Sequence, residues 1–402
     1  MNATPRISRY AALLAVPILF AVVAQAAQAD DLGRRSFRVQ LPASAGDQPI
    51  RLANLAGRIE IVPGTADPMS IETTVYAQGK DGVETQDLLQ RVKWVKGRDA
   101  KGREEWALSY PVDTYRGFHY PSSKNTDDDV PSFLSGMFDG ATSTLYRGEK
   151  VRVYGSRRSG IPTLYANVRI AMPPSAKIYV RNVVGPVDGA NLSGDLVIDT
   201  GCGDVKIASF DGHLVIDTGS GDVKVGTARG ESSIDTGSGD VVVAHLIGNS
   251  AIDTGSGDVR VEGVSAGKLA IDTGSGDVSV KNGAAGRLVA DTGSGSVEVL
   301  GVELEELVAE TGSGDVSVHS SLAKTRKMSI ETGSGEVSIK GGQSASFDIS
   351  SDQGSGRLNV GYSDAVLRKD GHKVIGAKRL NGQTAIHVET GSGDCTISPN
   401  QM

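Results

Sequence analysis

A phrase of eight residues recurs through much of this chain at nearly constant spacing. Residues 216–223 read Ile-Asp-Thr-Gly-Ser-Gly-Asp-Val, and close copies precede and follow them. The first Gly of successive copies stands at residues 201, 219, 237, 255, 274, 293, 312, 333, 354 and 391, so most steps are 18 to 21 residues and the last is 37. Repetition at so short and regular a period predicts a solenoid, in which each repeat forms one coil.

Each period contains two stretches in which apolar and polar residues alternate. Leu214 and Ile216 share one side of a strand and Asp217 lies on the other; after the Gly-Ser-Gly turn, where glycines allow positive φ, Val223 and Val225 repeat the alternation. A further apolar residue is expected to fill the corner of each coil: Phe210, Ala228, Leu246, Val264, Ala284, Val302 and Leu322. Parallel, in-register stacking about 4.8 Å apart then gives an all-β fold. The prediction is a parallel β-solenoid of about ten coils of 18–21 residues, on the order of 45 Å long.

The first residues have the composition of a secretory signal peptide. Arg6 and Arg9 precede an apolar run at residues 11–24, and residues 27–29 read Ala-Gln-Ala, which suits a cleavage site. We expect residues 1–29 to be removed before Asp30, with Ala26 as a second possible cleavage position. No later stretch is long and apolar enough for a transmembrane helix. The mature protein is therefore predicted to be exported to the periplasm or the extracellular space, with no transmembrane segment.

Charge and cysteine content restrict the chemistry further. The formal net charge is −7, and nucleic-acid binding requires a basic surface, so we expect no nucleic acid partner. The cysteines, Cys202 and Cys395, stand in the first and last clear repeats. In an extended rod they would be too far apart for a disulfide.

Residues 30–180 read as a β region packed on one end of the solenoid. Strands are predicted at residues 37–41, 51–55, 58–62, 70–76, 150–154 and 164–170, and a strand pair at residues 91–95 and 105–110. A short helical turn is expected at the start of residues 83–95, and residues 54–61 resemble a worn copy of the repeat. A polar insertion at residues 115–146 carries the acidic run 127–129. The repeats, with a C-terminal cap, occupy residues 181–402.

These features together resemble a known family. The Asn-x-x-Gly-x-Ile-x-Ile pattern at residues 54–61, the Pro-bounded strand end at residues 171–174 and the run of Thr-Gly-Ser-Gly-Asp-Val coils are similar to the putative-adhesin domain family of bacterial envelope proteins. The likeness covers residues 37–397, and the insertion at residues 115–146 departs from it. The resemblance implies a toast-rack-like β-solenoid, an extracytoplasmic location and no established enzymatic activity.

The repeated Asp-Thr-Gly-Ser phrase also occurs in aspartic proteases, where two loops bring two carboxylates together. Here the phrase is repeated in tandem at the spacing of the coils, whereas a protease site needs two loops facing each other from two large halves. The six His residues are scattered, without a close pair at metal-ligand spacing. Serines of the turns have no recurrent His partner for nucleophilic catalysis. We therefore predict no catalytic residues and no enzyme.

Stacking places carboxylates in two columns. One contains Asp199, Asp217, Asp235, Asp253, Asp272 and Asp291, continued by Glu310 and Glu331, and the other contains Asp204, Asp222, Asp240, Asp258, Asp277 and Asp315. Charges about 5 Å apart repel by roughly 1 to 3 kcal/mol. Our interpretation is that backbone N–H groups of the turns cap these carboxylates, so no cofactor or metal is predicted. The alternative is Ca²⁺ between coils, held by Asp217, Asp222, Asp235, Asp240, Asp253 and Asp258, although the spacing differs from that of calcium β-rolls.

The functional prediction is an exported, non-enzymatic β-solenoid of the bacterial cell envelope, acting as an adhesin or as a surface or assembly scaffold. Its partner would be an envelope protein or a polysaccharide. The alternative is a carbohydrate-active β-helix enzyme or a carbohydrate-binding protein, in which Asp127–Asp129 would meet a groove of the solenoid. A hairpin around residues 366–375 and the final strand, residues 386–397, are predicted to form the C-terminal cap. Deleting residues 364–402 is therefore expected to cause self-association.

Overall fold

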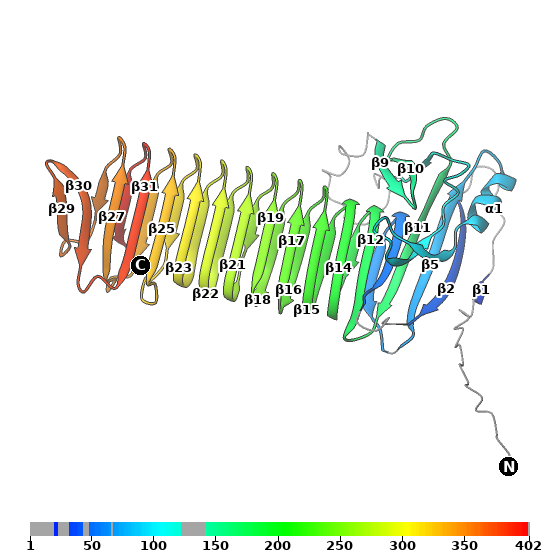
Figure 1. Ribbon diagram of the computed structural model, residues 1–402, viewed down its shortest axis with the longest axis horizontal. Coiled ribbons are helices and arrows are strands. Elements are labelled where there is room, and N and C mark those ends of the chain that lie inside the picture. The colour runs from blue at the N-terminus through cyan, green and yellow to red at the C-terminus, as the bar shows by residue number, and fades with distance from the viewer. Residues whose placement is uncertain (1–19, 23–31, 43–47, 66, 122–140, 401–402) are drawn as a thin grey trace, which may run out of the picture.

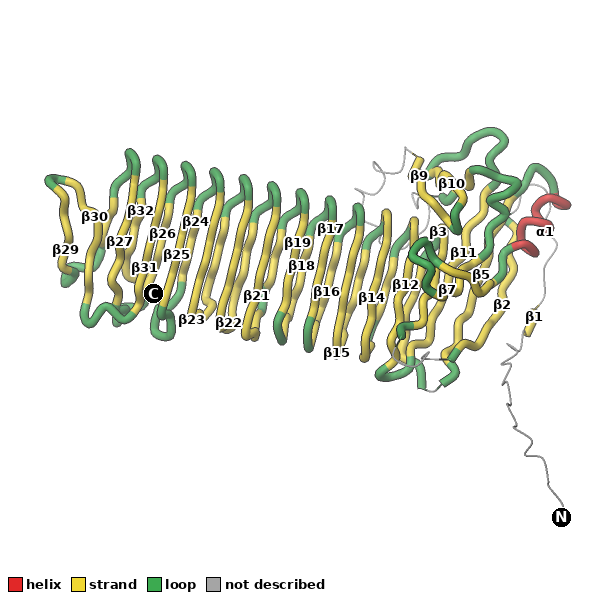
Figure 2. The backbone as a smooth tube through the Cα atoms, viewed as in Figure 1, coloured by secondary structure: helices red, strands yellow, loops and turns green. Residues whose placement is uncertain are grey.

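The computed structural model describes residues 20–22, 32–42, 48–65, 67–121 and 141–400. The molecule is an elongated rod, with the N-terminal β region at one end and strands β29 and β30 at the other (Figure 1). Turns follow one another along an edge of the rod, as Figure 2 shows. The predicted parallel β-solenoid is confirmed.

Two walls of parallel strands enclose the core. In spatial order the first wall contains β3 (Ile50–Ala56), β12 (Ala176–Val184), β14 (Leu192–Cys202), the second half of β15 (Val205–Thr218), β17 (Ser232–Thr236), β19 (Ser250–Thr254), β21 (Val264–Thr273), the second halves of β22 (Val278–Thr292) and β23 (Val297–Thr311), and β25 (Lys327–Thr332). The second wall contains β4 (Ile59–Pro63), β13 (Val187–Gly189), the first half of β15, β16 (Val223–Arg229), β18 (Val241–Ile247), β20 (Val259–Val261), the first halves of β22 and β23, β24 (Val316–His319) and β26 (Val337–Gly341).

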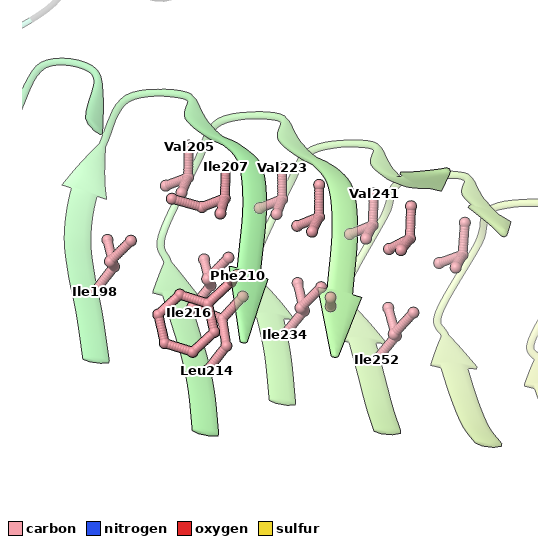
Figure 3. Close-up of a cluster of buried hydrophobic side chains, with 14 of the residues drawn as sticks. Ile198, Val205, Ile207, Phe210, Leu214, Ile216, Val223, Ile234, Val241 and Ile252 are labelled. Atoms are coloured by element: carbon pink, nitrogen blue, oxygen red, sulfur yellow. The ribbon is translucent and has the colours of Figure 1, made fainter. Parts of the chain in front are cut away.

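The core is built from columns of identical or similar apolar side chains. Ile216, Ile234 and Ile252 pair in register on neighbouring strands, and each is at most 2% exposed (Figure 3). Valines of the second wall, among them Val223 and Val241, close the core from the other side. Burying one such side chain contributes about 1.5–3 kcal/mol, so a long stack of narrow coils can be stable without large aromatic residues.

The corner of each coil is filled as predicted except in one place. Phe210, Leu246 and Val302 are buried at their corners. Ala284, however, is exposed, and the neighbouring Ala285 is 4% exposed. Ala285 pairs in register with Ala266 of the preceding coil. The corner position in register with Val264 and Val302 is occupied here by Gly283, which has no side chain, so Ala285, two residues further along, is the buried residue of this corner.

The turns show why the phrase contains Thr and Gly. In most coils a buried Thr donates its hydroxyl to a Gly carbonyl of the preceding coil, as in Thr292 Oγ1 to Gly276 O at 2.8 Å. Thr200 Oγ1, in contrast, is buried without a described hydrogen-bond partner. A Cβ on Gly276 would lie 1.9 Å from Gly257 O. Among the described Gly-x-Gly turns of the repeats, a left-handed φ occurs only at Gly203 (157°) and Gly221 (153°). The expectation that both glycines of each turn supply positive φ was wrong. Most of these glycines are required because the turns stack so closely that a Cβ would collide with the backbone of the neighbouring turn.

Replacing Gly276 by Val is expected to destabilise the rod by about 3 kcal/mol or more, since neither stacked backbone can move away without breaking neighbouring coils. Gly97→Val is the matched control, because nothing lies within 4 Å of a Cβ at that position. Chemical denaturation followed by circular dichroism measures both. Equal stability of the two variants would contradict the stacking argument.

The N-terminal region continues the second wall and covers its end. Next to β4 the wall adds β11 (Thr163–Met172), β5 (Met69–Gln78), β2 (Gly33–Leu41) and β1 (Phe20–Val22). Helix α1 (Gly82–Arg91) is capped at its N-terminus by Asp81, whose side chain accepts the Glu84 N–H at 2.8 Å. The hairpin of β6 (Trp94–Arg98) and β7 (Glu104–Leu108) extends the first wall beside β3, and β8 (Gly117–His119), β9 (Ala141–Tyr146) and β10 (Glu149–Tyr154) complete the region. The predicted strands at residues 37–41, 51–55, 58–62, 70–76, 150–154 and 164–170, the helical turn and the worn coil of β3 and β4 are confirmed. The strand predicted at residues 91–95 begins only at Trp94, because α1 extends to Arg91, and the predicted insertion at residues 115–146 contains β8 and β9.

The C-terminal coils do not follow chain order. Strands β31 (Thr384–Thr390) and β32 (Cys395–Pro399) insert between the coil of β25 and β26 and the coil of β27 (Phe347–Gln353) and β28 (Leu358–Val360). Hairpin β29 (Val366–Asp370) and β30 (Lys373–Arg379) then pairs antiparallel with β27 and forms the tip. The hairpin is terminal as predicted. The final strand is not part of a cap, because it lies one coil inside the tip.

Candidate functional site

A continuous row of carboxylates runs along the outside of the first wall. Its members, in spatial order and paired in register, are Asp199, Asp217, Asp235, Asp253, Asp272, Asp291, Glu310, Glu331, Glu389 and Asp352. All but the half-buried Asp199 are exposed. We call these ten residues the carboxylate ladder. Glu389 and Asp352 extend the row predicted from the sequence, because β31 and β27 add their own copies at its end.

The protein does little to neutralise this charge. Within the described residues, no hydrogen bond or ion pair reaches the ladder carboxylates except at Asp199, which accepts a hydrogen bond from Tyr179 Oη. Burial, together with the charges of Asp199 and Asp235, raises the pKa of Asp217. Burial and the next carboxylates along the row likewise raise the pKa of Asp253 and of Asp291. The ladder is thus a line of mutually repelling negative charges about 4.8 Å apart.

These raised pKa values give the ladder a defined effect on stability. A carboxyl whose folded-state pKa is raised stabilises the fold when protonated, and this contribution is lost as pH rises through the folded pKa. The triple variant Asp217→Asn, Asp253→Asn and Asp291→Asn should therefore be more stable than wild type near neutral pH, by about 1 kcal/mol in total after screening by water. The advantage should shrink toward the ordinary Asp pKa of about 4. Thermal melts across this pH range test it, and a less stable variant at neutral pH would refute it.

Small side chains beside the ladder leave it open to a partner. The neighbouring outward column on the same wall contains Val215, Ser233, Ala251 and Ala270. In the column beyond it, Lys177 pairs with Asp195 at 3.8 Å and Arg287 with Glu306 at 3.4 Å, whereas Lys268 and Lys327 form no ion pair with a described residue. An extended cationic partner could therefore contact many carboxylates without meeting bulky side chains.

The second column of carboxylates has a structural task. Each turn Asp accepts the backbone N–H of the equivalent residue in the next coil, as Asp240 Oδ1 does from Asp258 N at 2.9 Å and Asp277 Oδ1 does from Ser296 N at 2.8 Å. The same bond recurs at Asp204, Asp222, Asp258, Asp315 and Asp394. Backbone capping is therefore confirmed for this column, but the donors belong to the next coil's Asp position and not to the Gly-Ser-Gly residues.

The six calcium candidates divide between these two columns. Asp217, Asp235 and Asp253 belong to the ladder, and Asp222, Asp240 and Asp258 are the turn residues that cap backbone N–H groups. Over the described ranges, no group of three or more His, Cys, Asp or Glu side chains converges on a possible metal position. The arrangement offers distributed negative charge and not a coordination cage.

An open groove of about 510 Å³ lies on the outside of the second wall, near the N-terminal region. Its floor contains Ala190, Ala208, Gly226 and Ala244, and Lys206 and Lys224 line it. The equivalent residue in the next coil is Glu262, which ends the row of small residues. This groove, which distinguishes a few coils from the others, was not predicted from the sequence. The signal was a run of Ala or Gly at one fixed position of four successive repeats.

The described chain also contains two free cysteines, Cys202 and Cys395, both buried. Burial raises the pKa of Cys395 to about 12, so its thiol is not nucleophilic at neutral pH. No described helix has the length and apolar character needed to cross a membrane. Asp127–Asp129, on which the enzyme alternative rested, lie outside the described residues.

Comparison with known proteins gives a family match and weak structural likenesses. Residues 234–398 match the family model Toastrack DUF4097. A crystal structure of a protein from Parabacteroides distasonis ATCC 8503, described as a putative lipid binding protein, aligns with 90% of this chain and 96% of its own at 10% identity, with a TM-score of 0.32. One from Clostridium sporogenes ATCC 15579, described as a putative cell adhesion protein, aligns with 92% and 100% at 9% identity, with a TM-score of 0.15.

No curated protein matches the chain. The two structural likenesses are too low to support an inference about ligands. The family match, in contrast, covers the later copies of the repeated phrase, from Ile234 onwards. Residues 234–398 of this chain are therefore similar to the Toastrack family.

Proposed function

We propose that this protein is an exported, non-enzymatic binding rod of the bacterial cell envelope, acting as an adhesin or an assembly scaffold. The observation that carries the proposal is the carboxylate ladder, in which ten side chains, nine of them exposed, form one row on the outside of the first wall. Such a row costs stability at neutral pH, so we infer that it serves a purpose other than folding. A partner with cationic groups along an extended chain would relieve the repulsion on binding.

Binding of an oligolysine peptide tests this proposal. Calorimetry should show binding to the wild-type chain that weakens with salt, because the carboxylates are exposed and screened. The variant Asp235→Asn, Asp253→Asn and Asp272→Asn should bind roughly tenfold more weakly, a loss of about 1.4 kcal/mol. The proposal would be wrong if the peptide did not bind, or if the variant bound it as well as wild type.

A matched control removes the same number of charges elsewhere. Asp211, Glu262 and Glu298 are exposed and lie outside the ladder. Changing them to Asn, Gln and Gln alters the net charge equally but leaves the row intact. Oligolysine affinity should then stay close to that of the wild type, which separates binding by the ladder from a response to net charge.

A further inference from the structure

Exposed apolar side chains are concentrated at one tip of the rod. Among the described residues, eight large apolar side chains are exposed, and half of them belong to one hairpin: Val366 (70%), Leu367 (43%), Ile375 (40%) and Leu380 (59%). Single exposed apolar residues are ordinary on a protein surface, whereas a local cluster marks an interaction site. We call residues 366–380, which comprise β29, β30 and Leu380, the tip hairpin.

The tip hairpin lengthens the first wall, so that this wall extends beyond the end of the second wall. Strand β30 pairs with β27 of the first wall, and β29 pairs with β30. In the second wall, the described pairings end at β28, which pairs with β32. Val366 lies opposite Lys378 and Leu367 opposite Ala377, so the two apolar residues of β29 lie on opposite faces of the hairpin. Apolar side chains are therefore exposed on both faces of the hairpin. The two strands of this hairpin form one end of the rod (Figure 1).

Charge distinguishes the tip from the rest of the rod. Residues 366–380 contain five Lys or Arg and one Asp, in a chain whose net charge is −7. Arg368 is paired with Asp348 at 2.5 Å. Lys369 and Lys378 form no ion pair within the described part of the chain, and they lie opposite Val374 and Val366. Apolar side chains and unpaired cations are thus adjacent.

The free edge of β29 is poorly suited to pairing with another strand. A register shift between Arg368 and Lys369 interrupts its pairing with β30, and bulges and edge lysines both disfavour strand addition. Apolar residues on both faces beside cations suit a lipid surface, because apolar side chains enter the headgroup region while lysines extend to anionic headgroups.

We propose that the tip hairpin docks the rod on an anionic phospholipid surface. Insertion is shallow, since an unpaired strand edge cannot enter the hydrocarbon layer. The carboxylate ladder is repelled by the same surface, so the rod meets it tip first. This contact is separate from the binding proposed for the ladder.

Sedimentation with vesicles of phosphatidylglycerol and phosphatidylcholine tests the docking of the full chain. Wild type should bind these vesicles and bind pure phosphatidylcholine much more weakly, and added salt should reduce the binding. Two variants, Val366→Ser with Leu380→Ser and Lys369→Gln with Lys378→Gln, should each lower the partition coefficient by roughly tenfold. All four positions are exposed, so the melting temperature should remain close to that of wild type, as a parallel melt will verify.

Val83→Ser is the matched control, because Val83 is 82% exposed and lies on α1 at the opposite end of the rod. Its vesicle binding should equal that of wild type, and the tip variants should still bind oligolysine through the ladder. No vesicle binding by wild type, or equal binding by every variant, would overturn the proposal. Loss of concentration-dependent self-association in the tip variants, without vesicle binding by wild type, would assign the tip to a second copy of the chain instead.

Discussion

Replacing Ile252 by Asp should lower the free energy of unfolding by about 4 kcal/mol or more, because it places a charge with no partner in a narrow apolar core. Ile252 is 2% exposed and lies between Ile234 and Ile271 in one buried column. In a solenoid each coil contacts only its neighbours. The damage should therefore be local at first and should divide the rod into two parts that melt separately.

The matched control for this variant is Ala251→Asp. Ala251 precedes Ile252 on the same strand, β19, but its side chain is exposed on the outside of the first wall. The same charge introduced one residue earlier should cost little. Denaturant titration followed by circular dichroism distinguishes the two, and comparable losses at both positions would show that the register is wrong.

Deleting residues 364–402 should cause the rod to aggregate, and more severely than removal of a cap alone would. The deletion removes the tip hairpin together with β31 and β32, which lie inside the rod between the coil of β25 and β26 and the coil of β27 and β28. Strands β27 and β28 then lose their parallel partners, and open edges favour association with other chains.

A second variant separates the effect of losing the tip hairpin from the effect of losing the inserted coil of β31 and β32. Replacing only residues 366–379 by a short Gly-Ser linker keeps β31 and β32 in place and exposes one edge of β27. Light scattering should show strong aggregation for the long deletion and a milder effect for the linker variant. A long deletion that remained monomeric at high concentration would contradict the inserted position of the final coil.

Much of the fold could be predicted because the residue pattern within each repeat determines which side chains face the core and which repeat positions stack on one another. Alternation at Ile252 and Asp253 assigns one residue to the core and the other to the surface, and the tandem spacing places each above its counterpart. The inserted final coil could not be predicted in this way. The copies containing Glu389 and Asp352 carry similar patterns, so nothing local decides which of them stacks on Glu331.

The candidate site was predictable only in part. Alternation indicated the first eight carboxylates of the ladder, but their lack of neutralising partners depends on side chains from other coils. The tip hairpin could be predicted from its Asp-Gly turn at Asp370 and Gly371. The exposure of Val366 and Leu380 could not, because it arises where no further strand among the described residues packs against the hairpin. Such features follow from where the walls end, which sequence periodicity does not determine.

The most direct test of the account is capture of the natural partner from an envelope extract. Immobilised mature wild-type chain should retain a cationic component, which about 0.5 M salt should release because the contact is between exposed charges. The variant Asp235→Asn, Asp253→Asn and Asp272→Asn should fail to retain the same component, while the control with Asp211, Glu262 and Glu298 neutralised should retain it. Retention of the same components by the ladder variant and the wild type would contradict the claim that the carboxylate ladder is the binding surface.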